Sequence, residues 1–158
     1  MKRTKNPAKE AEYRKRAADL VAQMTLHEKV SQMLSWAPAI ERLGIPAYNW
    51  WSEGIHGVGR AGTATVFPQA IGMAAAFDED MMEQVGNAVG VEARGKYNMC
   101  RAHGDRDIFK GLTVWAPNIN IFRDPRWGRG HATYGEDPFL TSRLGVRFVE
   151  GMQGNDPD

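Results

Sequence analysis

Residues 112–138 read LTVWAPNINIFRDPRWGRGHATYGEDP and contain the clearest strand, the longest polar loop and the clearest helix start of the chain. The apolar run 112–116 is rich in β-branched and aromatic residues and stops at Pro117, which predicts a buried strand. Residues 118–136, rich in Arg, Asp, Gly and Trp, predict a loop. Asp137-Pro138 is typical of a helix start, with Asp as the N-cap and Pro at the first helical position.

Toward the N-terminus, the pattern predicts two helices and a second strand. A helix over 9–23 ends near Met24, and Thr25 with Glu28 forms a capping box for the next helix. The apolar stretch 45–51 predicts a short buried strand. The apolar residues of the second helix recur at helical spacing: Leu26, Val30, Met33 and Leu34.

The segment between the two predicted strands contains a further helix. The small apolar run 70–76 fits either a short helix or a tightly packed strand. The acids of residues 78–80 lie where a helix N-terminus favours negative charge, which predicts a helix running toward Tyr97. Its inward stripe is Met82, Val85 and Val89. The last helix stops at Gly154 and is lined on one side by Phe139, Leu140, Leu144, Val149 and Met152.

Helices and strands therefore alternate along the chain, which predicts the α/β class with a parallel sheet. In such folds the loops that follow the carboxyl ends of the strands carry the chemistry. These loops are residues 50–65 and 117–136, and they hold most of the unusual residues. The sequence thus predicts a site built from two loops that are far apart in the chain.

Composition narrows the function classes. The chain has 158 residues, enough for one domain or part of one, and a net charge of +1, which argues against nucleic acid as the partner. No window approaches 18 apolar residues, so no membrane span is expected. Residues 1–16 carry seven basic and two acidic side chains, but no apolar run follows them. Without a signal peptide the expected location is cytoplasmic, or periplasmic or secreted if the gene model is incomplete.

Three local patterns suggest chemistry that the surrounding sequence does not support. The G-x-G-x-x-G at 57–62 precedes a β-branched stretch ending in Pro68, whereas a dinucleotide site needs a helix there. His103, Asp105 and Asp107 match no metal-ligand spacing and are typical of an exposed turn. Cys100 lacks a nearby base and is expected to be a buried apolar residue. We expect no metal and no cofactor.

Two loop motifs suit a sugar. Adjacent strand residues face opposite ways, so one of Trp50 and Trp51 should point off the packed face. An indole beside the Glu53 carboxylate suits a pyranose, whose apolar face packs on the ring while its hydroxyls bond the carboxylate. Structural packing explains the spacing equally well.

Three arginines lie within seven residues of the second loop, and they suit phosphate, carboxylate or sugar hydroxyls. Arg123 and Arg126 have acids nearby (Asp124, Glu136, Asp137) and are interpreted as tying the loop down. Arg129 lies between two glycines and is the best placed of the three to face a ligand.

Several stretches together resemble glycoside hydrolase family 3. They occur in the order of that family and cover nearly the whole chain from about residue 15. The Trp-Trp-Ser-Glu form of the first loop is closest to its β-xylosidase branch. The stretches are 18–30 (ADLVAQMTLHEKV), 48–58 (YNWWSEGIHGV), 67–69 with 77–78, 116–130 (APNINIFRDPRWGRG) and 134–138 (YGEDP).

The resemblance implies a fold and an activity. The family has an N-terminal (β/α)8 barrel, usually followed by an α/β sandwich domain, and removes terminal non-reducing sugars with retention of configuration. Residues 17–158 would be the N-terminal part of that barrel, after a basic extension at 1–16. The resemblance places Trp51, Glu53 and Arg129 against the sugar, with Trp115 lining the pocket. Glu53 would take the room of a hexose hydroxymethyl group, favouring xylose or arabinose over glucose.

The sequence departs from the family pattern in two ways, and both bear on the expected fold and activity. Ala132 occupies a position where the family usually has Glu. A full barrel needs about 250 residues, so this chain holds only the first few βα units, a partial barrel. The family's nucleophile and acid/base segments have no counterpart, so we expect no catalytic residue and no activity from the chain alone.

Two functions remain open. The chain supplies part of the sugar subsite of an enzyme that hydrolyses β-D-xylosyl or β-D-glucosyl residues of oligosaccharides or aryl glycosides, together with the missing C-terminal part. Alternatively, it is a truncated, inactive sugar-binding remnant. A third hypothesis, a nucleotide-binding module, is supported only by the glycine loop at 57–62.

Overall fold

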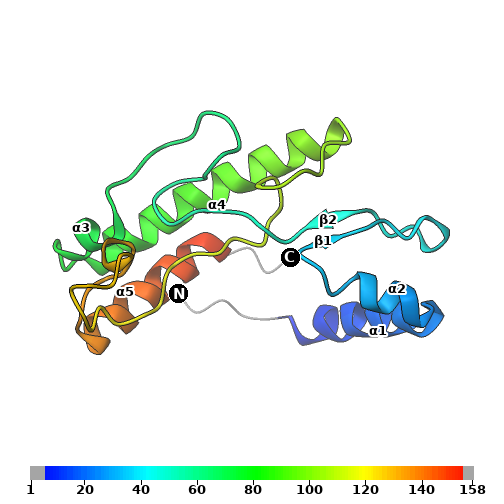
Figure 1. Cartoon of the computed structure of the whole chain (residues 1–158), viewed down its shortest axis with the longest axis horizontal. Coiled ribbons are helices and arrows are strands. Elements are labelled where there is room, and N and C mark those ends of the chain that lie inside the picture. The colour runs from blue at the N-terminus through cyan, green and yellow to red at the C-terminus, as the bar shows by residue number, and fades with distance from the viewer. Residues whose placement is uncertain (1–5, 155–158) are drawn as a thin grey trace.

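The computed structural model of the chain describes residues 6–154, so Lys2, Arg3 and Lys5 of the basic extension lie outside the described residues. No helix in this part of the chain is both long and apolar enough to span a membrane. The elements follow in the order α1 (Pro7–Gln23), α2 (Leu26–Ser31), β1 (Trp36–Ala37), η1 (Glu41–Leu43), β2 (Tyr48–Asn49), α3 (Ala70–Ala74), α4 (Glu79–Ala102), η2 (Gly130–Ala132) and α5 (Pro138–Gln153) (Figure 1).

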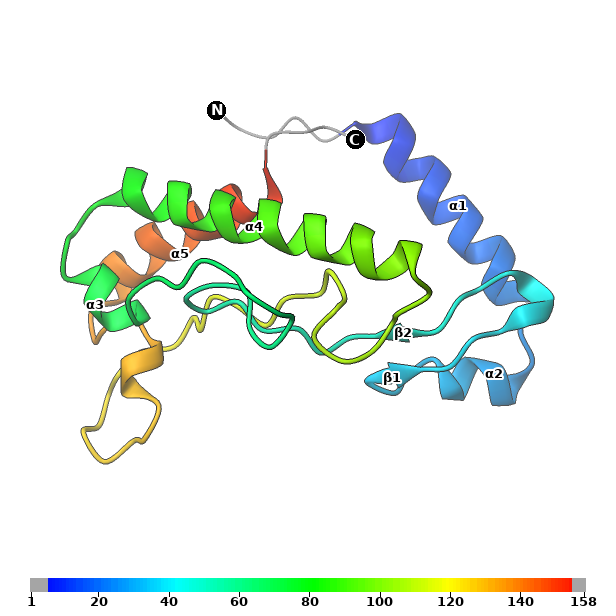
Figure 2. The same cartoon turned by 90° about the horizontal axis from the view of Figure 1, so that it is seen from above.

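The elements gather in two groups. α1, α2 and the β1–β2 pair form an arm at one end, while α3, α4 and α5 pack together at the other (Figures 1 and 2). The loop after β2 is tied to α4, because Glu92 accepts hydrogen bonds from Thr65 and Lys96 donates to the carbonyls of Ala61 and Thr63. The long helix α4 therefore supports the first of the two predicted site loops.

The helix boundaries follow from local capping. The Thr25–Glu28 capping box is formed as predicted, and Asp78 and Asp137 cap α4 and α5. The sequence allowed either a short helix or a tightly packed strand at 70–76, and the structure has the short helix α3 there. Arg42 donates to the Glu28 carboxylate and, with the Thr25 amide, lowers the pKa of Glu28 to about 2. This ion pair joins η1 to the start of α2.

The core lies where α3, α4 and α5 meet. Met82, Val85 and Val89 form the predicted inward stripe of α4, and Leu144 is fully buried on α5. The prediction for Phe139 was wrong: it is 73% exposed, because the buried face of α5 runs through residues 141, 144, 145 and 148 instead. That face includes Phe148, which the sequence analysis missed.

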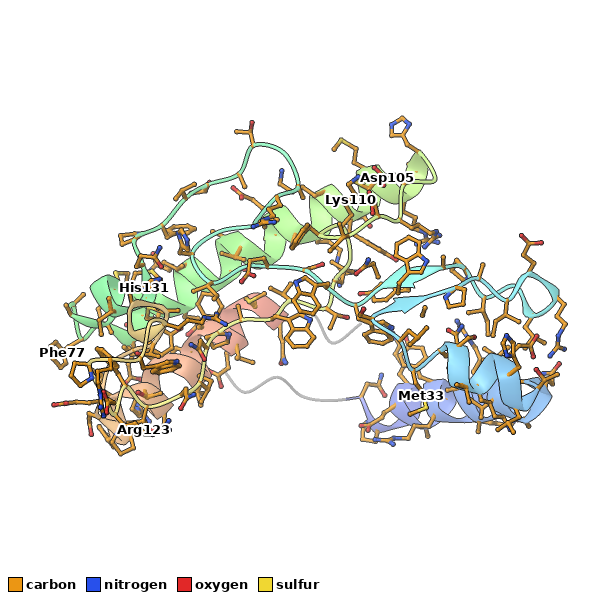
Figure 3. All side chains as sticks on the ribbon, viewed as in Figure 1. Met33, Phe77, Asp105, Lys110, Arg123 and His131 are labelled. Atoms are coloured by element: carbon orange, nitrogen blue, oxygen red, sulfur yellow. The ribbon has the colours of Figure 1, made fainter. Side chains whose placement is uncertain are left out.

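The apolar side chains of the stripe predicted after Thr25 are exposed to solvent. Leu26 and Val30 lie on α2 but are exposed among the described residues. Met33 and Leu34 fall beyond the end of α2 at Ser31 and are exposed as well; Figure 3 shows Met33 on the arm. α2 is thus held by its cap and the Arg42 ion pair rather than by burial.

The predicted parallel sheet is not found among residues 6–154. The sheet there is the antiparallel pair β1–β2, with Trp36 opposite Asn49. The strand predicted at 112–116 shrinks to one bridge, which does run parallel, between Val114 and Ser52. The physical reason is that the amides of Leu112 and Thr113 bond the Tyr48 phenol, leaving them no ladder bond to a strand. The α/β class and the partial barrel are therefore not confirmed.

Close approach of α4 and α5 depends on glycine at their contact. A Cβ atom added at Gly86 would lie 2.3 Å from the Phe148 carbonyl oxygen, far inside van der Waals contact. Gly95 lies on the same helix, but a Cβ added there meets nothing within 4 Å. The two positions therefore separate the packing role of glycine from its weak helix propensity.

We predict opposite effects of the same substitution at these two positions. Gly86→Ala should lower the free energy of unfolding by about 1–3 kcal/mol, because α5 has to shift. Gly95→Ala should raise it by about 0.5–1 kcal/mol through better helix propensity. Urea unfolding followed by far-UV circular dichroism measures both, and equal effects would contradict the packing described here.

Candidate functional site

All four predicted site residues line one hollow. Trp51 and Glu53 come from the loop after β2, and Trp115 and Arg129 come from the long segment between α4 and α5. The hollow has a volume of about 460 Å³, which suits one or two sugar rings in size. Its other lining residues are Val114, Ala116, Pro117, Asn118 and Ile119. The two loops chosen from the sequence therefore meet in space.

Backbone hydrogen bonds join the two segments that form the hollow. The Trp115 amide donates to the Ser52 carbonyl (2.9 Å), and the Phe109 amide donates to the Trp51 carbonyl (2.8 Å). The Ser52 hydroxyl adds a bond to the Gly111 carbonyl (3.2 Å). Because side chains alternate along an extended chain, burial of Ser52 sends Trp51 and Glu53 to the opposite side, into the hollow.

The two tryptophans of the hollow stack on each other. Their ring centroids are 5.0 Å apart and their planes differ by 24°. The Trp115 indole is held in place because its Nε1 donates to the Trp50 carbonyl (2.7 Å). Trp51 is 44% and Trp115 is 57% exposed, so the pair remains accessible. An exposed indole face is apolar and packs well against the carbon face of a pyranose.

The charged side chains that line the hollow are Glu53 and Arg129. The carboxylate of Glu53 accepts hydrogen bonds, and the guanidinium of Arg129 only donates them, so together they match hydroxyls that do both. Both side chains also line a second hollow, of about 340 Å³, with the polar residues His56, Gln69 and His131. These three residues were not predicted as site residues, although His56 and Gln69 lie within the stretches 48–58 and 67–69, and His131 directly follows 116–130.

The other two arginines of the second loop do not line either hollow. Arg126 makes a two-pronged ion pair with Asp124 (2.9 and 2.6 Å), which lowers the pKa of Asp124. Arg123 donates to the Asn120 side-chain oxygen (2.8 Å). Both arginines therefore tie the loop down, although the partner of Arg123 is an amide and not an acid. Figure 3 labels Arg123 and His131 in the half that contains α3 and α5.

The remaining candidates have structural roles. The glycine loop 57–62 is followed by extended chain, and the next helix begins at Ala70. Asp105 pairs with Lys110 (2.6 Å), and the ion pair lowers the pKa of Asp105 (Figure 3). Across residues 6–154 no group of three His, Cys, Asp or Glu side chains is arranged to hold a metal. Cys100 is half-buried, whereas the sequence predicted a buried apolar residue.

Comparison with known proteins decides the family. The model of the glycosyl hydrolase family 3 N terminal domain matches residues 16–156. The chain belongs to glycosyl hydrolase family 3. The resemblance found in the sequence motifs is thereby confirmed.

Relatives of this family 3 chain include β-xylosidases. It is 50% identical to a probable β-D-xylosidase 7 of Arabidopsis thaliana over 91% of its own length and 19% of the relative's. It is 49% identical to a xylan 1,4-β-xylosidase of Xylanibacter ruminicola over 89% of its own length and 17% of the relative's. It is also similar to the solved structure of a family 3 exo-β-xylosidase with a xylobiose aziridine probe (TM-score 0.76, 37% identity, 89% and 18% covered). The chain thus spans less than a fifth of these proteins.

The stacked tryptophans of this family 3 chain should have a spectroscopic signature. Two indoles at this separation couple electronically, so we expect a paired band in near-UV circular dichroism. Trp51→Phe and Trp115→Phe should each remove the same band, whereas Trp36→Phe should leave it unchanged. A spectrum in which the Trp51 and Trp115 variants lose different bands would contradict the stack.

Proposed function

We propose that this family 3 chain forms part of the xylose-binding subsite of a retaining β-xylosidase. The substrates would be oligosaccharides or aryl glycosides with a terminal non-reducing β-D-xylosyl or β-D-glucosyl residue. The observation that carries the proposal is one hollow lined by the stacked pair Trp51–Trp115 together with Glu53 and Arg129. The similarity to β-xylosidases supports xylose as the sugar.

Each side chain has a role that follows from its chemistry. The indole pair covers the apolar face of the sugar and excludes water from it. Glu53 accepts hydrogen bonds from hydroxyls, and Arg129 donates to the oxygens of others. A fixed charge of each sign would hold the ring in one orientation, so that the anomeric carbon faces the attacking group. Xylose fits better than glucose, because the Glu53 carboxylate would crowd an added hydroxymethyl group.

The chain by itself should bind sugar without cleaving it. Retaining hydrolysis needs two carboxyl groups about 5 Å apart. Among the described residues, Glu53 is the one acid that lines the hollow. The nucleophile and the acid/base would then come from the remaining part of a longer enzyme. The same observation favours the second candidate function, an inactive sugar-binding remnant.

Xylose titration of the purified chain, followed by tryptophan fluorescence, tests the proposed subsite. We expect xylose to change the emission and glucose to bind more weakly. Glu53→Ala and Arg129→Ala should each weaken xylose binding about tenfold or more, the loss expected for a hydrogen bond to a charged group. Arg14→Ala, at an exposed position of α1 away from the hollow, is the matched control and should bind as the unmodified chain does.

Two results would contradict the proposal. One is xylose binding that is unchanged by both Glu53→Ala and Arg129→Ala in folded protein. The other is release of nitrophenol from nitrophenyl β-D-xyloside by the purified chain, since one carboxylate in the hollow does not suffice for retaining cleavage.

A further inference from the structure

The phenol of Tyr48 is fully engaged with the segment that carries Trp115. Its oxygen accepts from the amides of Leu112 (2.9 Å) and Thr113 (3.0 Å) and lies 2.9 Å from the Thr113 hydroxyl. A phenol has two acceptor positions and one proton. Because the two amides fill the acceptor positions, the phenol proton points to the Thr113 hydroxyl oxygen. One side chain of β2 thus binds three groups of the facing segment.

Tyr48 and its partner Thr113 each lie a few residues before one indole of the site. Thr113 is two residues before Trp115, and Tyr48 is three residues before Trp51. Beyond Tyr48, the segments are linked by the single-pair Ser52–Val114 bridge and by a few hydrogen bonds of Trp51 and Ser52. The phenol therefore takes the place of ladder bonds here: it binds two successive amides, which in a sheet would donate to strands on opposite sides.

The ring of Tyr48 reaches the site by a second route. It meets the Trp50 ring edge-on, with centroids 4.9 Å apart and planes at 72°. The carbonyl of Trp50 accepts the hydrogen bond from the Trp115 indole (2.7 Å). Tyr48 therefore touches the residue that orients Trp115 as well as the segment that carries it.

We propose that Tyr48 is a positioning residue of this site: its phenol sets the register of 48–52 against 111–115 and so keeps Trp115 stacked on Trp51. The expected effect of Tyr48 on sugar binding rests on the proposed function, because xylose would pack on the stacked pair. Loss of the phenol oxygen leaves two partly buried amides and one hydroxyl without this partner. The segment 111–115 is then free to shift, and Trp115 shifts with it.

Tyr48→Phe tests the role, because it removes the oxygen and keeps the ring. We expect the paired near-UV band of Trp51 and Trp115 to lose at least about half its amplitude, and xylose to bind about fivefold or more weakly. Tyr13→Phe, at an exposed position of α1, is the matched control and should change neither readout. The far-UV spectrum reports whether each variant is folded.

A second pair of variants covers the case in which Tyr48→Phe does not fold. Thr113→Val keeps the shape and removes the hydroxyl that receives the phenol proton, whereas Thr113→Ser keeps a hydroxyl. The paired band should weaken in Thr113→Val and persist in Thr113→Ser. An unchanged band and unchanged xylose binding in folded Tyr48→Phe, or an unchanged band in Thr113→Val, would overturn the proposal. If the unmodified chain does not bind xylose, the proposed function fails, while the band still decides the role of Tyr48.

Discussion

The backbone pairing of residues 48–53 with 109–115 is the interaction on which the site depends. It joins two segments that are far apart in the chain, and each contributes one indole to the wall of the hollow. Without it Trp51 would have no partner, and Glu53 and Arg129 would not line the same hollow. The pairing is narrow, because it consists of a few backbone bonds, the Ser52 hydroxyl and the Tyr48 phenol.

The helices supply the support that so narrow a pairing needs. A Cβ atom added at Gly54 would lie 2.7 Å from a methyl group of Val114 and 3.3 Å from one of Val89. The absence of a side chain at Gly54 therefore lets the paired segments lie against α4, which also packs on α5 in the core. A hydrogen bond donated by the loop after β2 to Glu92, and one donated by Lys96 to a carbonyl of that loop, strengthen the same attachment. The core therefore holds α4 in place, α4 supports the paired segments, and the paired segments position the site residues.

The parts of this arrangement that rest on local chemistry were predictable from the sequence. Thr25 with Glu28, Asp78 and Asp137 mark helix starts because each binds amides of its own first turn. Trp51, Glu53 and Arg129 could be singled out from residue type and loop position, and Trp115 from the family resemblance. Their assembly could not, because the stacking of Trp51 on Trp115 and the bonds of Tyr48 join positions far apart in sequence. The strand at 112–116 was overpredicted for a related reason: β-propensity does not tell whether a neighbouring strand is there to bind the amides.

The central claim is that these residues form the xylose subsite of a β-xylosidase, and a chimera tests it most directly. Residues 16–156 of this chain would replace the matching segment of the Xylanibacter ruminicola xylan 1,4-β-xylosidase, to which they are similar. We expect the folded chimera to hydrolyse nitrophenyl β-D-xyloside, and Glu53→Ala within it to lower kcat/KM about tenfold or more. A folded chimera that is inactive would favour the sugar-binding remnant, and an active one indifferent to both Glu53→Ala and Arg129→Ala would contradict the account.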